Sequence, residues 1–311
     1  MVVNPRVSVV IPTRNRPELV LRAVRSALAQ SIREIEVIVV IDGPDPETLA
    51  ALRAVDDARL RWVDLEHSVG GSEARNIGVR TASTPWVAFL DDDDEWLPQK
   101  LALQIDLAAK MQGNIFIGSL FFERSPAGER ILPRVAVNVD TPVSELLFAR
   151  TGLLSGTAYI QTSTWFISRE LLLEVPFTKG LRRNQDADWM LHALTRPRVS
   201  IAIIPEPLTI FHDDMRPGRV SRKADWRFHY QWALNNRTYF TRRALAFFLL
   251  TTCIHDAVAN DEPLGVVGFL LKESFRLGNP NPLALAFFLY YWLVTDGLRR
   301  TWRAREVETC A

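Results

Sequence analysis

The chain has 311 residues, with 37 basic and 36 acidic side chains and 48% hydrophobic residues. This composition is typical of one large or two modest globular domains, and it excludes a disordered chain or a strongly basic nucleic-acid-binding protein. The charge is uneven: residues 1–214 carry 23 Lys and Arg against 28 Asp and Glu (−5), whereas residues 215–311 carry 14 against 8 (+6).

Two features bear on the cellular compartment. The cysteines, Cys253 and Cys310, lie far apart and match no metal-ligand spacing, so a reducing compartment is expected. The N-terminus enters an apolar run almost at once and lacks the charged and apolar regions of a signal peptide. We therefore expect a cytoplasmic protein, peripheral at the inner face of the cell membrane if its C-terminal part binds lipid.

The first 120 residues alternate between strand and helix patterns. Apolar β-branched runs predict strands at 7–11, 35–41 and 60–63. Helical spacing of apolar residues predicts helices at 17–28, 47–54 and 73–80, the last with Ser72 as its N-cap. Because the strands are continuous apolar runs separated by helices, we expect an α/β fold with a mostly parallel sheet flanked by helices.

The most informative stretch is an apolar run at 86–90 that ends in four consecutive carboxylates, Asp91–Asp94. Taken alone, it is either a solvated acidic loop or a cation site, since Mg²⁺ and Mn²⁺ prefer carboxylate oxygen. Polar residues also follow the first two strands, at Thr13–Arg16 and Asp42. The carboxyl ends of parallel strands meet at one sheet edge, where ligands bind, so the sequence favours a nucleotide and cation site there.

Four ordered motifs resemble the successive motifs of family 2 glycosyltransferases, which are inverting enzymes with the GT-A fold. They are the segments 7–17, 37–43, 70–78 and 89–97. The resemblance implies a GT-A-like nucleotide-sugar-binding and catalytic domain over 1–220, followed by a helical region over 221–311. The implied reaction is transfer of a sugar from a nucleoside-diphosphate sugar to an acceptor hydroxyl with inversion, assisted by Mg²⁺ or Mn²⁺.

The resemblance also implies roles at the predicted sheet edge. Arg75 would approach the diphosphate, with an ion pair on a helix surface as the alternative. Ile41 stands where the family usually has a further carboxylate, which leaves the nucleoside base open. The nucleoside itself would be held by Pro12, Thr13, Asn15 and Asp42.

The acidic stretch supplies the Asp-x-Asp motif that the resemblance implies. Asp93 would bind the metal, and Asp91 would bind the ribose or the metal through water. Asp92 is a further cofactor-binding candidate. In the alternative alignment of the motif, Asp92 or Asp94 would take the place of these residues. The metal would neutralise the charge on the departing nucleoside diphosphate. His212, which follows a predicted strand at 200–204, is a second candidate metal ligand, with a structural histidine as the alternative.

An inverting displacement needs one base within reach of the acceptor hydroxyl. The family takes it from a Glu-Asp pair at the start of a helix, and this chain has Gln185-Asp186. Asp186 is the predicted base and Asp188 the fallback, with helix capping as the alternative role. Candidates for closing over the diphosphate are Arg216, Arg219 and Arg222.

The C-terminal region contains intensely apolar runs at 244–254 and 282–294, both shorter than the ~20 residues that a spanning helix needs. One interpretation is a helix lying at a membrane surface, and the other is a packed subdomain or a homodimer contact. Membrane contact would suit a lipid-linked glycan or a growing surface polysaccharide as acceptor.

Two other functions remain open. A nucleotidyltransferase also uses carboxylates and metal on a parallel sheet, but it needs a glycine-rich phosphate loop, and segment 12–16 contains no glycine. A sugar-nucleotide-binding scaffold without turnover is favoured by Pro44 and Gln185, which depart from the family pattern.

Overall fold

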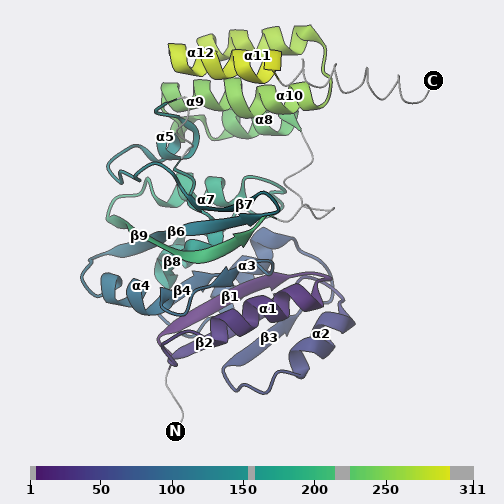
Figure 1. Cartoon of the computed structure of the whole chain (residues 1–311), viewed down its shortest axis with the longest axis vertical. Helices are drawn as coiled ribbons and strands as arrows, with labels where there is room; N and C mark the ends of the chain where they lie inside the picture. The colour runs from purple at the N-terminus through teal and green to yellow at the C-terminus, as the bar shows by residue number, and fades with distance from the viewer. Residues whose placement is uncertain (1–4, 153–157, 214–224, 295–311) are drawn as a thin grey trace, which may run out of the picture. The chain divides into compact units, whose positions relative to one another are not determined.

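The computed structural model describes residues 5–152, 158–213 and 225–294 (Figure 1). Cys310 and the three candidate closing arginines, Arg216, Arg219 and Arg222, lie outside these residues. Contacts within the chain divide it into two units. The sheet unit comprises Met1–Val139 and Tyr159–Pro217, and the helical unit comprises Asp140–Ala158 and Gly218–Ala311.

Within the described residues, nine strands form one mixed sheet in the order β3-β2-β1-β4-β8-β6-β9-β5, with β7 paired to β6. The first four strands are parallel, β8 is antiparallel to both of its neighbours, and β6 and β9 are parallel. The strands are β1 (Val7–Thr13), β2 (Ile35–Ile41), β3 (Leu60–Asp64), β4 (Trp86–Phe89), β5 (Glu95–Trp96), β6 (Asn114–Ser125), β7 (Gly128–Leu132), β8 (Phe166–Ser168) and β9 (Val199–His212).

Helices accompany the sheet and make up the helical unit. Those of the sheet unit are α1 (Pro17–Leu28), α2 (Pro46–Arg53), α3 (Gly71–Thr81), α4 (Lys100–Ala108), η1 (Thr162–Thr164), α6 (Arg169–Glu174) and α7 (Gln185–Ala193). Those of the helical unit are α5 (Val143–Phe148), α8 (Trp226–Asn235), η3 (Arg237–Tyr239), α9 (Arg242–Phe248), η4 (Leu249–Cys253), α10 (Ile254–Ala259), α11 (Leu264–Leu277), α12 (Pro282–Leu289) and η5 (Tyr290–Val294).

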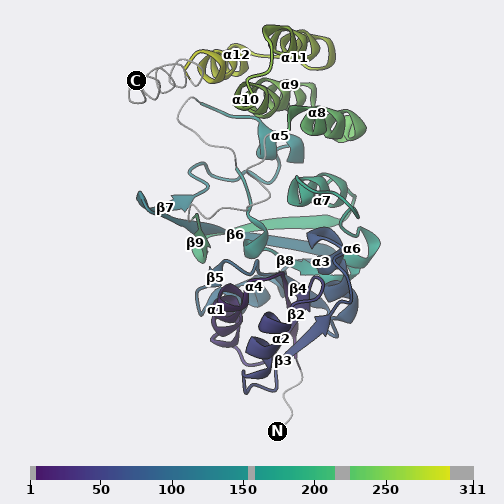
Figure 2. The ribbon, with the colours of Figure 1, turned by 90° about the vertical axis from the view of Figure 1, so that its right-hand side faces the viewer.

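The alternation of side chains along β1 explains how helices cover both faces of the sheet. Val9 belongs to the core cluster that includes Val20 and Val24 of α1. The next residue, Val10, points to the opposite face and packs against Gly78 of α3. Figure 2 shows α1 and α3 on opposite sides of these strands. The α/β sheet flanked by helices is therefore confirmed.

One local prediction was wrong. The third helix begins at Gly71 with Gly70 as its N-cap, so Ser72 lies inside the first turn and not at the cap. The reason is the anchoring of the preceding loop: the Asp42 carboxylate accepts hydrogen bonds from the amides of Val69 and Gly70. Gly70 has φ +85°, a conformation that favours glycine, and the chain turns into the helix directly after it.

An aromatic cluster supports α7 in the sheet unit. Trp189 of α7 packs on Trp165 with ring centroids 5.2 Å apart, and on Phe177 at 5.8 Å. Phe116 of β6 packs on the same two tryptophans, at 5.4 and 6.1 Å. The Trp189 indole also donates a hydrogen bond to the carbonyl of Val175 at 2.7 Å. Buried aromatic contacts of this size fix the position of the helix firmly.

The helical unit has an aromatic core of its own. Phe148 of α5 packs on Phe240 and Phe248, with ring centroids 5.2 and 4.9 Å apart, and Trp232 of α8 joins the same cluster. Within the described residues no helix combines the length and the apolar character that crossing a membrane requires.

The packing of α3 on β1 generates a stability prediction. A Cβ atom at Gly78 would lie 2.3 Å from Cγ1 of Val10, a contact that the stiff valine side chain cannot relieve. Gly78→Ala is therefore expected to lower the free energy of unfolding by about 1–3 kcal/mol, measured by urea denaturation.

The matched control is Gly268→Ala within α11, where a Cβ atom meets no described atom within 4 Å. It should raise stability by about 0.5–1 kcal/mol, because alanine is the better helix former. Equal effects of the two substitutions would contradict the close packing of α3 on the sheet.

Candidate active site

The four carboxylates of the acidic turn, Asp91–Asp94, follow β4 and alternate between two environments. Asp92 and Asp94 are buried, at 6% and 0% exposure. The side chains of Asp91 and Asp93 are 24% and 18% exposed. The accessible pair, Asp91 and Asp93, therefore has the spacing of the predicted Asp-x-Asp motif. Asp92 and Asp94, which form the alternative pair, lie in the protein interior.

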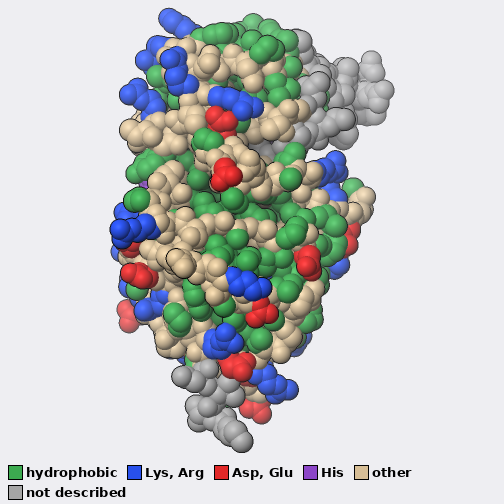
Figure 3. All heavy atoms as spheres, turned by 90° about the vertical axis from the view of Figure 1, so that its left-hand side faces the viewer, with side chains coloured by type: hydrophobic (Ala, Val, Ile, Leu, Met, Phe, Trp, Pro, Cys, Tyr) green, Lys and Arg blue, Asp and Glu red, His purple; other side chains and the backbone are tan. Residues whose placement is uncertain are grey.

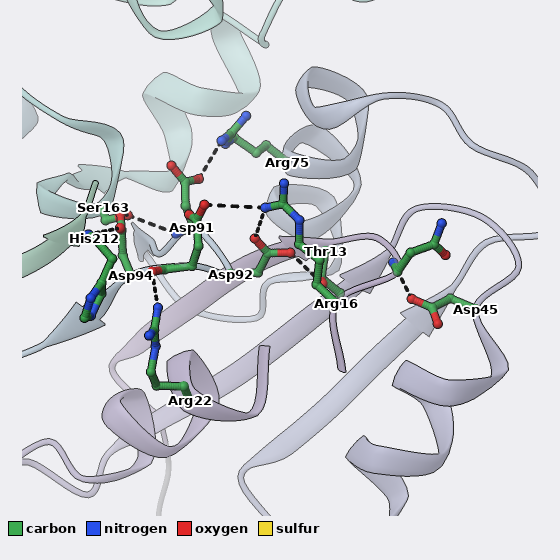
Figure 4. Close-up of polar contacts among 12 residues, drawn as sticks. Thr13, Arg16, Arg22, Asp45, Arg75, Asp91, Asp92, Asp94, Ser163 and His212 are labelled. Carbon is green, nitrogen blue, oxygen red and sulfur yellow. Dashed lines mark hydrogen bonds and ion pairs between the residues drawn. The ribbon is translucent and has the colours of Figure 1, made fainter. Parts of the chain in front are cut away.

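Two arginines, Arg16 at the N-cap of α1 and Arg22 within that helix, compensate the middle of this turn (Figure 4). Arg16 pairs with Asp92 at 2.9 Å and reaches Asp93 at 3.5 Å. Arg22 donates to the backbone carbonyl of Asp93. Burial raises the pKa of Asp92 to about 6, against the opposing effect of the Arg16 charge. The side chains of Arg16 and Arg22 thus offset the electrostatic repulsion among these carboxylates.

Arg75 links the acidic turn to the start of α7. One terminal nitrogen of its guanidinium donates to Asp91 at 2.6 Å, and the other donates to the Gln185 side chain at 2.9 Å. Its side chain is only 12% exposed. Arg75 therefore does form an ion pair, but within a largely buried contact that spans three elements, and not on an open helix surface.

Asp94 anchors the turn through hydrogen bonds from neutral groups. Its carboxylate accepts hydrogen bonds from the Gln161 amide at 2.7 Å and the Ser163 hydroxyl at 2.6 Å. The same Ser163 oxygen accepts from the Asp91 amide at 2.9 Å. Burial, followed by the charges of Asp93 and Asp91, raises the pKa of Asp94 well above its ordinary value. This arrangement fixes the turn to the segment around η1.

The predicted nucleoside-binding residues lie at the carboxyl ends of β1 and β2, as expected. Pro12 and Thr13 end β1, and the Thr13 hydroxyl donates to Asp92 at 2.7 Å. The Asn15 amide donates to Asp45 at 2.6 Å. The Asp42 carboxylate is bound by the loop before α3, through the Ser68 hydroxyl at 2.9 Å and backbone amides. These contacts bring the residues to one sheet edge, and their role toward a nucleoside stays a prediction.

His212 lies at the end of β9, beside the acidic turn. Its Nε2 atom is 2.7 Å from Glu95, and its backbone amide donates to Asp94 at 3.4 Å. Burial lowers the pKa of His212, against the opposing effect of Glu95. The neutral ring that this favours is the form that binds metals. Its part in a metal site stays a prediction, as does the metal role of Asp93.

The described residues contain no group of three or more His, Cys, Asp or Glu side chains arranged to hold a metal ion. The accessible carboxylates of Asp91 and Asp93 are nevertheless the oxygen ligands that Mg²⁺ and Mn²⁺ prefer. Mg²⁺ is usually held by one or two carboxylates together with substrate phosphates and water. The donor set therefore fits an ion that arrives with a diphosphate.

Asp186 lies in the first turn of α7, at its second residue. The N-cap is Asn184, so the helix-capping alternative for Asp186 is wrong. The carboxylate of Asp186 accepts hydrogen bonds from the Tyr159 hydroxyl at 2.7 Å and from the Ala187 amide at 2.8 Å. Asp188 is 3% exposed and accepts from the Thr178 hydroxyl at 2.6 Å. Asp186 is therefore the more accessible of the two carboxylates.

Several residues of this site were missed by sequence reasoning. Arg16 lies in the first motif. Because four adjacent carboxylates need nearby positive charge, charge balance could have identified this arginine as a partner of the turn. No local pattern links Gln161, Ser163 and Tyr159 to their partners, which lie 27 to 69 positions away in the sequence. Their roles depend on the tertiary fold.

Comparison with known proteins gives the family and the fold. The family model described as "Glycosyl transferase family 2" matches residues 8–173, more than half of the chain. The amylovoran biosynthesis glycosyltransferase AmsB of Erwinia amylovora is 27% identical over 245 residues, 76% of this chain and 79% of that protein.

A second relative is WfgD of Escherichia coli, named a UDP-Glc:α-D-GlcNAc-diphosphoundecaprenol β-1,3-glucosyltransferase. It is 28% identical over 130 residues, 41% of this chain and 51% of that protein. Among solved structures, the mannosyltransferase PcManGT of Pyrobaculum calidifontis, in complex with GDP-Man and Mn²⁺, has a TM-score of 0.52 at 18% identity. The match covers 98% of this chain and 81% of that one, and the expected GT-A-like fold is confirmed.

The pairing of Arg16 with Asp92 generates a pH-dependent prediction. The pKa of Asp92 in the folded state, about 6, lies above its ordinary value of 3.8. The stability that its protonation contributes is therefore complete below pH 3.8 and is lost as the pH rises through about 6. Arg16→Gln removes the opposing cation. It should lower stability by about 1–3 kcal/mol at pH 8 and by clearly less at pH 5.

The measurement is urea denaturation of wild type and variant at both pH values. Arg14→Gln is the matched control, because among the described contacts the Arg14 side chain is exposed and donates to the Ser68 hydroxyl. A loss of stability that is the same at pH 5 and pH 8 would contradict the assigned charge pair.

Proposed function

The chain belongs to glycosyltransferase family 2 and is a glycosyltransferase, and we propose that it transfers a sugar from a nucleoside-diphosphate sugar to an acceptor hydroxyl with inversion. In this proposal the sheet unit binds the donor and performs the transfer. Asp93 and Asp91 act at the diphosphate of the donor, and Asp186 acts as the base toward the acceptor hydroxyl.

The observation that carries the proposal is the position of Arg75. Its guanidinium contacts Asp91 of the acidic turn on one side and Gln185 on the other, at 2.6 and 2.9 Å. Gln185 is the chain neighbour of Asp186, so the candidate diphosphate site and the candidate base lie on two sides of one cation. An inverting transfer needs the base and the leaving group on opposite faces of the reacting carbon, and the nearness of both candidate groups to Arg75 is compatible with that requirement.

The chain's own groups account for the remaining steps. The guanidiniums of Arg75 and Arg16 can donate to phosphate oxygens, which they suit in shape and charge. Asp186 accepts the proton of the acceptor hydroxyl as the hydroxyl oxygen bonds to the anomeric carbon and the bond to the diphosphate breaks. Thr13, Asn15, Asp42 and the backbone at Pro12 hold the nucleoside.

A divalent cation, Mg²⁺ or Mn²⁺, would be held by Asp93 with Asp91 beside it, and it would stabilise negative charge on the departing diphosphate. Asp92 would support this pair indirectly through Thr13 and Arg16, with which it forms hydrogen bonds. His212, whose Nε2 atom lies 2.7 Å from Glu95, would be a further ligand.

The relatives suggest the kind of acceptor. AmsB is named for amylovoran biosynthesis, and WfgD is named for a diphosphoundecaprenol-linked acceptor. We propose a growing surface polysaccharide or a lipid-linked glycan as the acceptor here. The name of WfgD includes UDP-Glc and the PcManGT structure contains GDP-Man, so the nucleotide has to be determined by binding.

The first test is calorimetric titration of UDP, GDP and dTDP, with Mn²⁺ and again with chelator. Wild type should bind one nucleotide in a metal-dependent manner, and Asp93→Ala should lose at least about tenfold in affinity, because one coordinated carboxylate is missing. If no nucleotide binds under any condition, the acidic turn is a structural element and the proposal fails.

Asp186→Asn separates binding from chemistry and also tests the scaffold alternative. This variant should bind the nucleotide as wild type does, because Asp186 lies on the acceptor side. Release of UDP from UDP-glucose in the presence of GlcNAc-diphosphoundecaprenol should fall by about a hundredfold or more, as expected for loss of a general base. Full turnover in Asp186→Asn would exclude this residue as the base.

We also propose that α11 of the helical unit contacts a lipid surface. Leu264, Phe269 and Phe275 are 69%, 40% and 55% exposed, on the side of α11 opposite to buried Val267 and Leu270. Lys272 and Arg276 are exposed on the same side, although Arg276 also pairs with Glu273. Figure 3 shows hydrophobic side chains beside basic ones on one face of this unit. Apolar side chains beside cations are typical of helices that lie on anionic membranes.

Flotation with phosphatidylglycerol vesicles tests this surface. The variant Phe269→Ser/Phe275→Ser should bind at least about tenfold more weakly than wild type, because each buried phenylalanine contributes about 1.5–3 kcal/mol. Leu173→Ser is the matched control, since Leu173 is an exposed apolar residue (46%) of α6 in the sheet unit. Unchanged binding in the double variant, or dimerisation that the double variant abolishes, would contradict the lipid interpretation and favour a homodimer contact.

A further inference from the structure

The candidate base has a partner that no sequence motif indicates. Tyr159, the first residue of the sheet unit after the segment Asp140–Ala158, lies 27 positions before Asp186. Its hydroxyl donates to Oδ2 of Asp186 at 2.7 Å. The tyrosine is nevertheless 42% exposed, so part of its side chain remains accessible to a ligand.

From this geometry we propose that Tyr159 is a positioning residue that orients the Asp186 carboxylate and lines the place where the acceptor sugar binds. The inference rests on the proposed role of Asp186 as the base. It adds a residue and a function to the acceptor side of the site.

The first part of the argument concerns the orientation of the carboxylate. The aromatic cluster of Trp189, Trp165 and Phe177 fixes the backbone of α7, but it leaves the Asp186 side chain free to rotate about its own bonds. Oδ1 is held by the Ala187 amide at 2.8 Å, and Oδ2 is held by the Tyr159 hydroxyl. The two contacts together define the plane of the carboxylate.

The second part concerns the lone pairs of the base. Each carboxylate oxygen can accept two hydrogen bonds, and each oxygen of Asp186 accepts one in the described contacts. One acceptor position per oxygen therefore remains for a substrate hydroxyl. Desolvation of the phenol and the negative charge of Asp186 raise the pKa of Tyr159, so Tyr159 stays protonated and donates to the base.

The third part concerns the acceptor. A hydroxyl that Asp186 deprotonates must lie within hydrogen-bond distance of this carboxylate, and one bound to Oδ2 lies within about 6 Å of the Tyr159 hydroxyl. In this proposal the partly exposed Tyr159 side chain lies next to the acceptor sugar. Aromatic rings present a large apolar surface with a polar tip, which suits the apolar faces and hydroxyls of a sugar ring. Tyr159 can thus align the acceptor as well as the base.

Two substitutions separate these contributions. Tyr159→Phe removes the hydroxyl and keeps the ring, and Tyr159→Leu removes both. The probes are UDP-glucose and GlcNAc-diphosphoundecaprenol, with UDP release as the readout. Tyr159→Phe should lower kcat roughly tenfold or more with little change in the KM for the acceptor, as expected for loss of a hydrogen bond to a charged group. Tyr159→Leu should also raise the KM for the acceptor several-fold.

The double variant Tyr159→Phe/Asp186→Asn provides the decisive comparison. If Tyr159 acts through Asp186, adding Tyr159→Phe to Asp186→Asn should cost no further activity, and the two effects should not add. The matched control is Tyr230→Phe, which removes a hydroxyl that donates to Glu273 at the same distance, 2.7 Å, in the helical unit. Its kcat and KM should equal those of wild type.

The outcomes distinguish this inference from the proposed function. Loss of turnover in Asp186→Asn together with full kcat in Tyr159→Phe would overturn the role of Tyr159 and leave the base assignment intact. Full turnover in Asp186→Asn would remove the base itself. A loss in Tyr159→Phe that follows a lower melting temperature and weaker nucleotide binding would show a merely structural role, and it would also overturn the inference.

Discussion

The repulsion among four adjacent carboxylates is the constraint on which the site depends. Two unit charges 4 Å apart interact by about 4 kcal/mol at an effective dielectric constant of 20, so such a turn is unstable without compensation. Two arrangements reduce this repulsion. Asp94 is buried among neutral donors with a raised pKa, and Asp92 is buried against Arg16. The first loop, α1, α3 and the segment around η1 each contribute a partner, and these contacts hold the sheet edge in one conformation.

The same compensation prepares the site for an anionic ligand. Arg75 pairs with one carboxylate, and its second contact is the neutral amide of Gln185. A glutamate at position 185 would cancel more of the guanidinium charge, whereas glutamine leaves that charge for the diphosphate contact proposed above. The departure from the family's Glu-Asp pair is therefore compatible with an active enzyme. Two carboxylates, Asp186 and Asp188, lie in the first turn of α7, and Asp186 is the more exposed of them.

The parts of the molecule that could be predicted from sequence are those that follow from local pattern. Continuous apolar runs gave β1 and β2 because both faces of a parallel strand are buried, and the acidic turn was identified because its charge ends such a run. Ser72 was mistaken for an N-cap because the loop before α3 is fixed by Asp42, about 30 residues earlier. The contacts of Asp94 and Asp186 with Gln161 and Tyr159 join distant segments, and no periodicity encodes such pairs.

Two kinds of contact between distant segments determine the position and the orientation of the candidate base, Asp186. Packing of Trp189 into the aromatic cluster decides where α7 begins and therefore where the Asp186 backbone lies. The hydrogen bond from Tyr159 decides how the carboxylate is turned. Losing the first would destabilise the sheet unit, since a buried tryptophan typically contributes several kcal/mol. Losing the second would remove a single hydrogen bond, and under the proposed mechanism it would change the orientation of the base. A partly exposed tyrosine can therefore matter greatly to catalysis and little to stability.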